Sequence, residues 1–254
     1  MLKTGHHLSD DEIRARYEAL GHRGGLGMEF IYKVLSLAGD LKGSRVLDVG
    51  CGGGALLTEI AARQNDCELY GVDFSVSRLG KASRLLDVDA VLLEANVQET
   101  IPFPDDFFDR IFCTETLEHL KYPDRCLYEI IRLLKPEGRI ILTLPNATGF
   151  APFHLLAPLV PGRWLKGKFL PYEHPSNTDQ PIDTCYEYRE ILDLIQTAGL
   201  TIEIAEGYRY FRYLQMLPLV RDVYRVIYPA VQWTMPKIGG VRFAYNLLFR
   251  CHKK

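Results

Sequence analysis

The sequence predicts an α/β fold in which a mostly parallel sheet is covered by helices on both faces. Short β-rich runs alternate with helical patterns from residue 45 to residue 205, as βαβ units do. A glycine-rich loop joins the first of these runs to the first helix, which is typical of ligand-binding α/β domains. The chain has 254 residues, 47% of them hydrophobic, which suits one domain with a substantial core.

Each element of this fold has a local signal of its own. Apolar runs between turn residues predict the strands, which we expect at 45–49, 68–72, 90–93, 110–113, 139–144 and 201–205. Amphipathic segments predict the connecting helices, which we expect at 55–63, 75–86, 124–134 and 186–198. Gly199 suits the end of the last of these helices, and alternation over 242–251 predicts a final strand.

The first 40 residues form a helical leader of the single domain that we expect over residues 1–254. Helical patterns run over 8–20 and 28–37, and Ser9 with Glu12 makes a capping box at the first of them. Such a leader can fold over a cofactor or serve as a packing helix.

Two irregular insertions, residues 146–185 and 207–240, follow the fifth and sixth predicted strands. Both therefore leave the sheet at its carboxyl edge, where ligands bind in open parallel sheets. We expect them to form a helical cap over the active site.

Composition excludes several classes of protein. The net charge of −2 argues against nucleic acid as a partner. No apolar run approaches the ~18 residues of a membrane-spanning helix, and the N-terminal segment lacks the apolar region of a secretory signal. The six cysteines form no CxxC pair, which predicts reduced thiols and no zinc site. We therefore expect a cytoplasmic protein.

The glycine loop lies in the segment VLDVGCGGGALL, residues 46–57. Gly50, Gly52 and Gly54 allow a tight turn and a close approach of the backbone to a ligand, and the helix that follows presents free N–H groups. The string GCGGGA also satisfies the dinucleotide-binding pattern, so a NAD-dependent oxidoreductase is an alternative that must be weighed.

Two acidic residues bear on that choice. Asp48, just before the loop, suits a ligand with an ammonium group and would repel a pyrophosphate. Asp73, in GVDFS at the end of the second strand, suits ribose hydroxyls, which NAD and S-adenosylmethionine both have. Asp73 can instead cap the next helix, although Ser75 serves that purpose equally well.

The chain resembles the class I S-adenosylmethionine-dependent methyltransferases. Besides VLDVGCGGG and GVDFS, the resemblance rests on three further segments, which are EANVQETIPFPDDFFDRIFCTETLEHL, LYEIIRLLKPEGRIILTLPN and FAYNLLFR. It implies a Rossmann-like sheet of seven strands with an antiparallel last strand. It also implies a ubiquinone-biosynthesis O-methyltransferase-like activity with S-adenosylmethionine as the methyl donor.

The resemblance also assigns cofactor-binding residues. Gly50, Cys51, Gly52 and Gly54 would approach the methionine part of the cofactor, and Asp73 would hold the ribose. The adenine would meet the residues Phe74, Asn96 and Val97.

The segment CTETLEHL, residues 113–120, follows the fourth predicted strand and is the candidate chemical centre. Direct methyl transfer needs mainly in-line positioning and exclusion of water, but a hydroxyl or amine acceptor must also lose a proton. His119 has a suitable pKa for a general base, and Glu118 is its catalytic neighbour. Glu115 can orient the methionine part of the cofactor.

The spacing Glu-x-x-Glu-His is also that of metal-using relatives, such as the ubiquinone-biosynthesis and small-RNA 3′-end methyltransferases. Glu115, Glu118 and His119 are therefore candidate ligands for a divalent cation such as Mg²⁺, which would lower the pKa of an acceptor hydroxyl. His154 and His174 are further histidines that can complete such a site, although no motif supports either.

The basic charge of the chain is concentrated near its end. Residues 1–204 carry a net charge of −9, whereas residues 205–254 carry +7. Within residues 208–238 aromatic side chains alternate with basic ones, and Leu219, Val220, Val223 and Ile227 fall at helical spacing with Arg221 and Arg225 on another face. This pattern predicts peripheral contact with the inner face of a membrane or a site for an amphiphilic acceptor, and the alternative is an ordinary cap or homodimer helix.

The sequence thus predicts a methyltransferase acting on a small-molecule or lipid-like acceptor, most simply at a hydroxyl oxygen. A quinone precursor, a lipid-linked intermediate and a glycan intermediate all remain candidate acceptors. The alternatives are the NAD-dependent oxidoreductase and a cofactor-binding partner subunit without activity.

Overall fold

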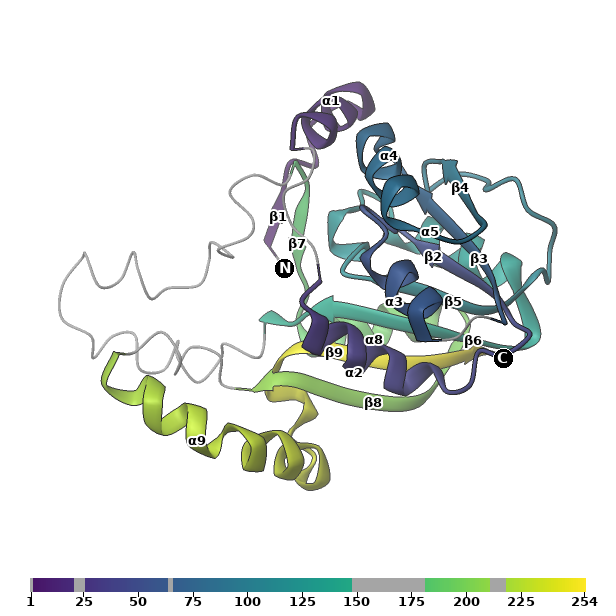
Figure 1. Cartoon of the computed structure of the whole chain (residues 1–254). Coiled ribbons are helices and arrows are strands. Elements are labelled where there is room, and N and C mark those ends of the chain that lie inside the picture. The colour runs from purple at the N-terminus through teal and green to yellow at the C-terminus, as the bar shows by residue number, and fades with distance from the viewer. Residues whose placement is uncertain (1, 21–25, 64–65, 148–180, 211–217) are drawn as a thin grey trace.

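A computed structural model describes residues 2–20, 26–63, 66–147, 181–210 and 218–254. Its main feature is a seven-stranded sheet with the spatial order β4-β3-β2-β5-β6-β9-β8 (Figure 1). Only β9 runs antiparallel to its neighbours in this sheet. The strands are β2 (Arg45–Val49), β3 (Glu68–Asp73), β4 (Ala90–Glu94), β5 (Phe108–Thr114), β6 (Leu134–Pro145), β8 (Leu200–Tyr210) and β9 (Ala244–Lys253). The predicted Rossmann-like α/β fold, with seven strands and an antiparallel last strand, is confirmed.

Helices cover both faces of this sheet. The α-helices are α1 (Asp10–Leu20), α2 (Met28–Ala38), α3 (Ala55–Arg63), α4 (Val76–Leu85), α5 (Pro123–Leu133), α8 (Tyr188–Thr197) and α9 (Pro218–Thr234). Short 3-10 helices occur at η1 (Leu117–His119), η5 (Met235–Ile238) and η6 (Gly240–Phe243). One apolar cluster packs α5 and α8 on one face of the sheet, and a second cluster packs α2, α3 and α4 on the other.

Alternation along the strands explains how one sheet supports two cores. In β5, Ile111 and Cys113 belong to the cluster with α5 and α8, while Phe112 between them belongs to the cluster with α2 and α3. All three side chains are fully buried. The strand therefore reads as a continuous apolar run, as expected for a strand covered on both faces.

The elements that have strong local signals in the sequence lie at the predicted positions. The first strand, 45–49, and the helix 55–63 have the predicted bounds. The capping box at α1 is also formed, because the Ser9 amide donates to Glu12 Oε2 at 2.8 Å and the Glu12 amide donates to Ser9 Oγ. Ser75 caps α4 through its hydroxyl, which accepts the Arg78 amide at 3.3 Å.

Three expectations need correction. The sixth predicted strand, 201–205, is the longer β8, so the irregular stretch does not begin at residue 207. The helix expected between Pro218 and Pro229 continues as α9 to Thr234. Pro229 removes one helical hydrogen bond, but Pro229 and Arg225 are both exposed, so water can satisfy the freed carbonyl.

The third correction is a small second sheet, in which β1 (Leu2–Thr4) pairs antiparallel with β7 (Asp183–Cys185). Both strands are three residues long, too short for periodicity to reveal, and β7 lies within the insertion expected at 146–185. Most of that insertion, including His154 and His174, lies outside the described residues, as do residues 211–217 of the second insertion.

Two further sequence expectations concern thiols and membrane spans. All six cysteines are free thiols. No helix in the described part of the chain is long and apolar enough to cross a membrane.

Candidate functional site

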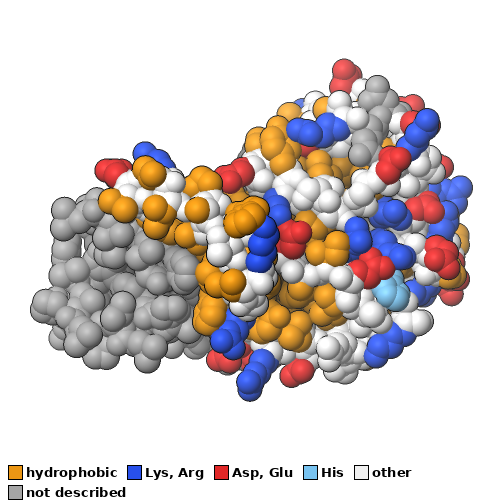
Figure 2. Space-filling view, turned by 90° about the horizontal axis from the view of Figure 1, so that it is seen from below, with side chains coloured by type: hydrophobic (Ala, Val, Ile, Leu, Met, Phe, Trp, Pro, Cys, Tyr) orange, Lys and Arg blue, Asp and Glu red, His pale blue; other side chains and the backbone are white. Residues whose placement is uncertain are grey.

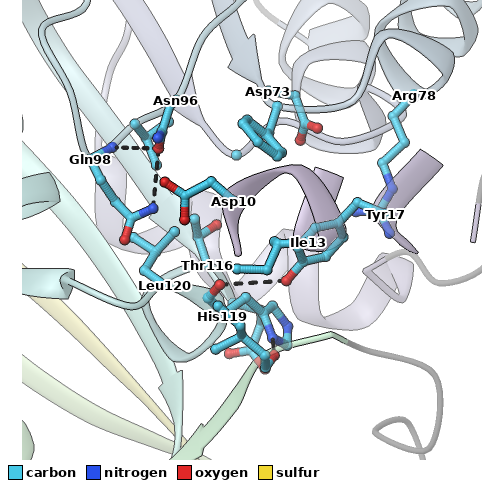
Figure 3. A pocket seen from close by; sticks show the side chains of 15 residues that line it. Asp10, Ile13, Tyr17, Asp73, Arg78, Asn96, Gln98, Thr116, His119 and Leu120 are labelled. Carbon is cyan, nitrogen blue, oxygen red and sulfur yellow. Dashed lines mark hydrogen bonds between the residues drawn. The ribbon is translucent and has the colours of Figure 1, made fainter. Parts of the chain in front are cut away.

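A pocket lies at the carboxyl edge of the sheet, where β2, β3, β4 and β5 end, with α1 packed over it (Figure 3). Its lining comes from α1, from the loops after these four strands and from the segment before β7. The lining residues are Asp10, Ile13, Tyr17, Gly50, Asp73, Phe74, Arg78, Asn96, Val97, Gln98, Glu115, Thr116, His119, Leu120 and Ile182.

The pocket brings together seven of the predicted site residues. These are Gly50, Asp73, Phe74, Asn96, Val97, Glu115 and His119. The other five, Asp48, Cys51, Gly52, Gly54 and Glu118, are not among its lining residues, and lie in or beside the same loops.

Gly50 and Gly52 give the loop after β2 its shape. Both have left-handed backbones, with φ of +76° and +53°. A Cβ at Gly50 would lie 2.5 Å from Thr116 Oγ1, whereas a Cβ at Gly52 would meet no atom within 4 Å. Gly50 therefore lets the loop pack against Thr116, and Gly52 leaves open space on its outer side. Gly54 serves helix packing, because a Cβ there would lie 2.8 Å from Ala82 Cβ in α4.

Asp73 is held against this loop by backbone amides. Its Oδ2 accepts the Gly52 amide at 2.8 Å, and its Oδ1 accepts the Ser75 amide at 2.9 Å. Burial nevertheless raises the pKa of Asp73, while the two amide donors and nearby Arg78 oppose the rise. The carboxylate thus has a fixed orientation at the pocket wall and still has lone pairs for further donors.

Asp48 is buried at 2% exposure, and its Oδ1 has no hydrogen-bond partner among the described residues. Burial and the nearby charge of Asp73 raise the pKa of Asp48 to about 8. A buried carboxyl without a partner is costly, and a cationic partner would relieve that cost. Burial likewise raises the pKa of the neighbouring Cys51 thiol, so this side chain stays a protonated packing group.

Asn96, Val97 and Phe74 form the other end of the pocket. Asn96 Oδ1 accepts from both the amide and the Nε2 of Gln98, each at 3.1 Å, and Asn96 Nδ2 donates to Glu99. Val97 is buried, and the Arg14 guanidinium lies 4.6 Å from the centre of the Phe74 ring. Gln98, which no motif singled out, would have to release Asn96 Oδ1 before that oxygen accepts from a ligand.

Glu115 has an unusual backbone and two fixed carboxylate contacts. Its φ of +49° lies in the left-handed region, which is rare for a side chain of this kind. Its Oε1 accepts from the Thr143 hydroxyl at 3.0 Å, and its Oε2 accepts from Asn246 Nδ2 at 2.9 Å. β6 and β9 therefore orient this side chain toward the middle of the sheet edge.

His119 is neutral and has a defined tautomer. Its Nδ1 lies 3.0 Å from the Ile182 carbonyl oxygen, which can only accept, so Nδ1 carries the proton and Nε2 has the free lone pair. Burial lowers the pKa of His119 to about 4. The imidazole is therefore neutral throughout the physiological pH range, and the low pKa makes it a weaker base than an exposed histidine.

Glu118, next to His119 in η1, is buried at 2% exposure. Its Oε2 has no hydrogen-bond partner among the described residues, and its Oε1 lies 3.9 Å from His119 Nε2. Burial first, and then the charge of Glu115, raise the pKa of Glu118 well above its ordinary value. A neutral Glu118 carboxyl does not favour protonation of the imidazole beside it.

No residue-level signal in the sequence predicted the contribution of α1. Tyr17 reaches across the pocket, and its hydroxyl donates to the His119 carbonyl at 3.4 Å (Figure 3). Glu18 accepts the amides of Val76 and Ser77 at 2.6 and 3.2 Å, which fixes α1 to the start of α4. Ile13 lines the pocket between these anchors. The leader thus packs over the pocket.

The predicted metal ligands do not converge in the described part of the chain. No group of three His, Cys, Asp or Glu side chains there has the arrangement of a metal site. Glu115 is directed to Thr143 and Asn246, and burial of the Glu118 carboxyl disfavours its charged form. These donors do not fit a divalent cation as they stand, so we derive no step through one.

Comparison with known proteins identifies the family. Residues 47–142 match a family model described as a methyltransferase domain. The ubiquinone biosynthesis O-methyltransferase of Xylella fastidiosa (strain M23) is 32% identical over 187 residues, which cover 72% of this chain and 70% of that protein.

Other curated relatives match over shorter stretches, and the chain spans about half of their length. A ubiquinone biosynthesis O-methyltransferase of Alkalilimnicola ehrlichii is 37% identical, over 44% of this chain and 46% of the relative. A ubiquinone/menaquinone biosynthesis C-methyltransferase of Bordetella avium is 31% identical, over 51% of this chain and 53% of the relative.

Among solved structures, an S-adenosylmethionine-dependent methyltransferase from Mesorhizobium loti has the same fold. The TM-score is 0.60 at 16% identity, with 87% of this chain and 96% of that chain covered. The NAD-dependent alternative finds no support in these matches, and the chain belongs to the class I S-adenosylmethionine-dependent methyltransferases.

Proposed function

We propose that this chain transfers a methyl group from S-adenosylmethionine to a hydroxyl oxygen of a small amphiphilic acceptor by in-line substitution. The observation that carries the proposal is that one pocket is lined by Gly50 of the glycine loop, the ribose-type acid Asp73 and the neutral His119. Relatives named as ubiquinone biosynthesis O-methyltransferases support transfer to oxygen. The relative named as a C-methyltransferase makes carbon the second candidate acceptor.

The pocket and the loop beside it suit the donor in four respects. Asp48 offers a buried carboxyl oxygen without a partner to the ammonium group of the donor. Gly52 leaves open space beside the loop, and Asp73 is oriented to accept from ribose hydroxyls. Phe74 and Val97 give the adenine an apolar surface at the other end.

The chemistry divides between the donor and this chain. Bound S-adenosylmethionine supplies a methyl group that is already activated on a sulfonium. His119 Nε2 accepts the proton of the acceptor hydroxyl, while Nδ1 stays bonded to the Ile182 carbonyl. Glu118 is a positioning residue beside the imidazole, and its raised pKa disfavours its charged form. Ile13 and Tyr17 of α1 help to exclude water from the pocket.

The test is transfer of label from methyl-labelled S-adenosylmethionine. The purified chain is incubated with labelled donor and a cell extract, and the products are partitioned between an organic and an aqueous phase. Label in the organic phase is the expected result. Label in the aqueous phase would contradict the amphiphilic acceptor and favour a polar one, such as a glycan intermediate. Donor binding without any transfer would support the inactive-subunit alternative.

A further inference from the structure

Helix α9 turns a row of apolar side chains toward solvent. Val223, Val226, Ile227, Trp233 and Ile238 of η5 are 62%, 80%, 47%, 68% and 69% exposed, and we call them the outer stripe. Val226 and Ile227 are three and four residues after Val223, and Trp233 is seven residues after Val226. These intervals place the side chains on one side of the helix. The same region forms a patch of apolar surface beside α9 in the space-filling view (Figure 2).

The opposite side of α9 is fixed to the sheet. Tyr224 is only 1% exposed, and its hydroxyl donates to the Tyr210 carbonyl at the end of β8. The Tyr228 ring lies 5.4 Å from the Tyr224 ring, centre to centre. These tyrosines hold the rotation of the helix, so the outer stripe cannot turn inward without breaking the contact with β8.

Basic side chains outnumber acidic ones in the segment that carries the outer stripe. Residues 208–243 contain six Lys and Arg but only one acid, Asp222. Arg225 and Arg242 are exposed, and the Lys237 ammonium lies 3.1 Å from the centre of the Trp233 ring. A tryptophan beside a lysine is the arrangement that lies well at a boundary between lipid and water.

An apolar stripe fits either a second copy of the chain or a lipid membrane, and charge decides between them. A second copy packed through α9 would bring two segments of net positive charge together, which is unfavourable. The phosphates of anionic lipids would complement those charges, and the acyl region would cover the stripe. We propose that the outer stripe binds the surface of an anionic lipid membrane, with α9 parallel to the membrane plane.

Such binding would bring the carboxyl edge of the sheet to the lipid. α9 follows the carboxyl end of β8, and the pocket lies on the same edge of the sheet. The membrane inference does not rest on methyl transfer, because lipid binding is measured without donor or acceptor. Failure of one proposal is therefore distinguishable from failure of the other.

The test is co-sedimentation of the full chain with vesicles. Vesicles of equal phosphatidylcholine and phosphatidylglycerol should retain the chain, and vesicles of phosphatidylcholine alone should retain at least tenfold less. Raising the salt from about 0.1 M to 0.5 M should weaken binding, because it screens the basic side chains. Equal binding to both kinds of vesicle, or binding to neither, would overturn the proposal.

A matched pair of variants locates the surface. Ile227→Glu and Val88→Glu change side chains of the same 47% exposure, but Val88 lies between α4 and β4, away from α9. Ile227→Glu should lower vesicle affinity about tenfold, a change of ~1.4 kcal/mol, whereas Val88→Glu should leave it unchanged. Equal effects of the two variants would contradict the assignment to α9.

The mass of the free chain in solution tests whether a second copy of the chain covers the outer stripe. Light scattering should give the same mass for the wild type and for Ile227→Glu. A dimer that Ile227→Glu dissociates would assign the stripe to a second copy and overturn the membrane proposal. Thermal unfolding should show equal stability for both variants, since both sites are exposed.

Discussion

The pocket at the ends of β2 to β5 and the outer stripe of α9 lie along one edge of the sheet, but their polar and apolar groups are arranged in opposite ways. Beside the pocket, the carboxyl groups of Asp48 and Glu118 are buried without full pairing. On α9, aliphatic side chains such as Val226 are exposed. Buried carboxyl groups are usually paired, and large aliphatic side chains are usually buried. Each region departs from its rule, and each departure indicates a partner from outside the chain.

The largest expected effect concerns His119. His119→Ala should lower kcat by about 10²- to 10⁴-fold, the usual contribution of a general base, with little change in donor affinity. His119→Asn keeps a donor near the position of Nδ1, so it should fold like the wild type and still lose kcat. Steady-state kinetics and donor titration measure both quantities, and full activity of His119→Asn would remove the base role.

The second prediction compares the core with the stripe in terms of stability. Phe112 is fully buried between α2, α3 and the sheet, so Phe112→Ala should lower the free energy of unfolding by about 3–5 kcal/mol. Val226→Ala should change it by less than about 0.5 kcal/mol, because Val226 is 80% exposed. Urea unfolding measures both. A large loss in Val226→Ala would mean that part of the chain itself covers the stripe.

The third prediction separates backbone strain from ligand space. Gly52→Ala and Gly239→Ala both place an alanine at a positive φ, with no atom within 4 Å of the new Cβ. Each should lose about 1–2 kcal/mol of stability from strain. Only Gly52→Ala should also weaken donor binding, by about tenfold, because its methyl group fills the space beside the loop. Isothermal titration provides the affinities, and equal donor affinity in the two variants would place the donor elsewhere.

The smallest expected effect is the release of a proton from Asp48 when the donor binds. The pKa of Asp48 is raised to about 8 in the free protein, above its ordinary value of 3.8, so the folded chain holds a proton there at pH 7. The contribution of Asp48 to the free energy of unfolding is complete below pH ~4 and is lost as the pH rises through 8. An ammonium beside Asp48 favours the charged carboxylate, so donor binding should release a proton.

Titration in two buffers of different ionisation enthalpy measures that release at pH 7. Up to one proton is expected for the wild type, and Asp48→Asn should release correspondingly less. Equal release from both proteins would mean that the donor ammonium does not approach Asp48.

The fold was largely predictable because its signals are local. The run at 45–49, the glycine loop and the helix 55–63 are contiguous in sequence, and the structure has them at the predicted positions. Motifs also located seven of the 15 residues that line the pocket, since Gly50, Asp73 and His119 each lie at or after the end of a strand at the same edge.

Features that depend on distant residues could not be predicted. Glu115 is oriented by Asn246, which is 131 residues away, and β1 pairs with β7 across most of the chain. The rotation of α9 likewise depends on a contact with a distant strand. Helical spacing grouped Val223 and Ile227 as an apolar face, but the contact of Tyr224 with Tyr210 decides which side packs inward.

The most direct test of the central claim is a crystal structure of the chain with S-adenosylhomocysteine, the demethylated product of the donor. We predict that the ribose hydroxyls donate to Asp73, that the ammonium group lies beside Asp48, and that Ile13 and Tyr17 of α1 contact the ligand. A ligand bound away from the glycine loop, with Asp73 bonded only to Gly52 and Ser75, would contradict the assignment of this pocket to methyl transfer.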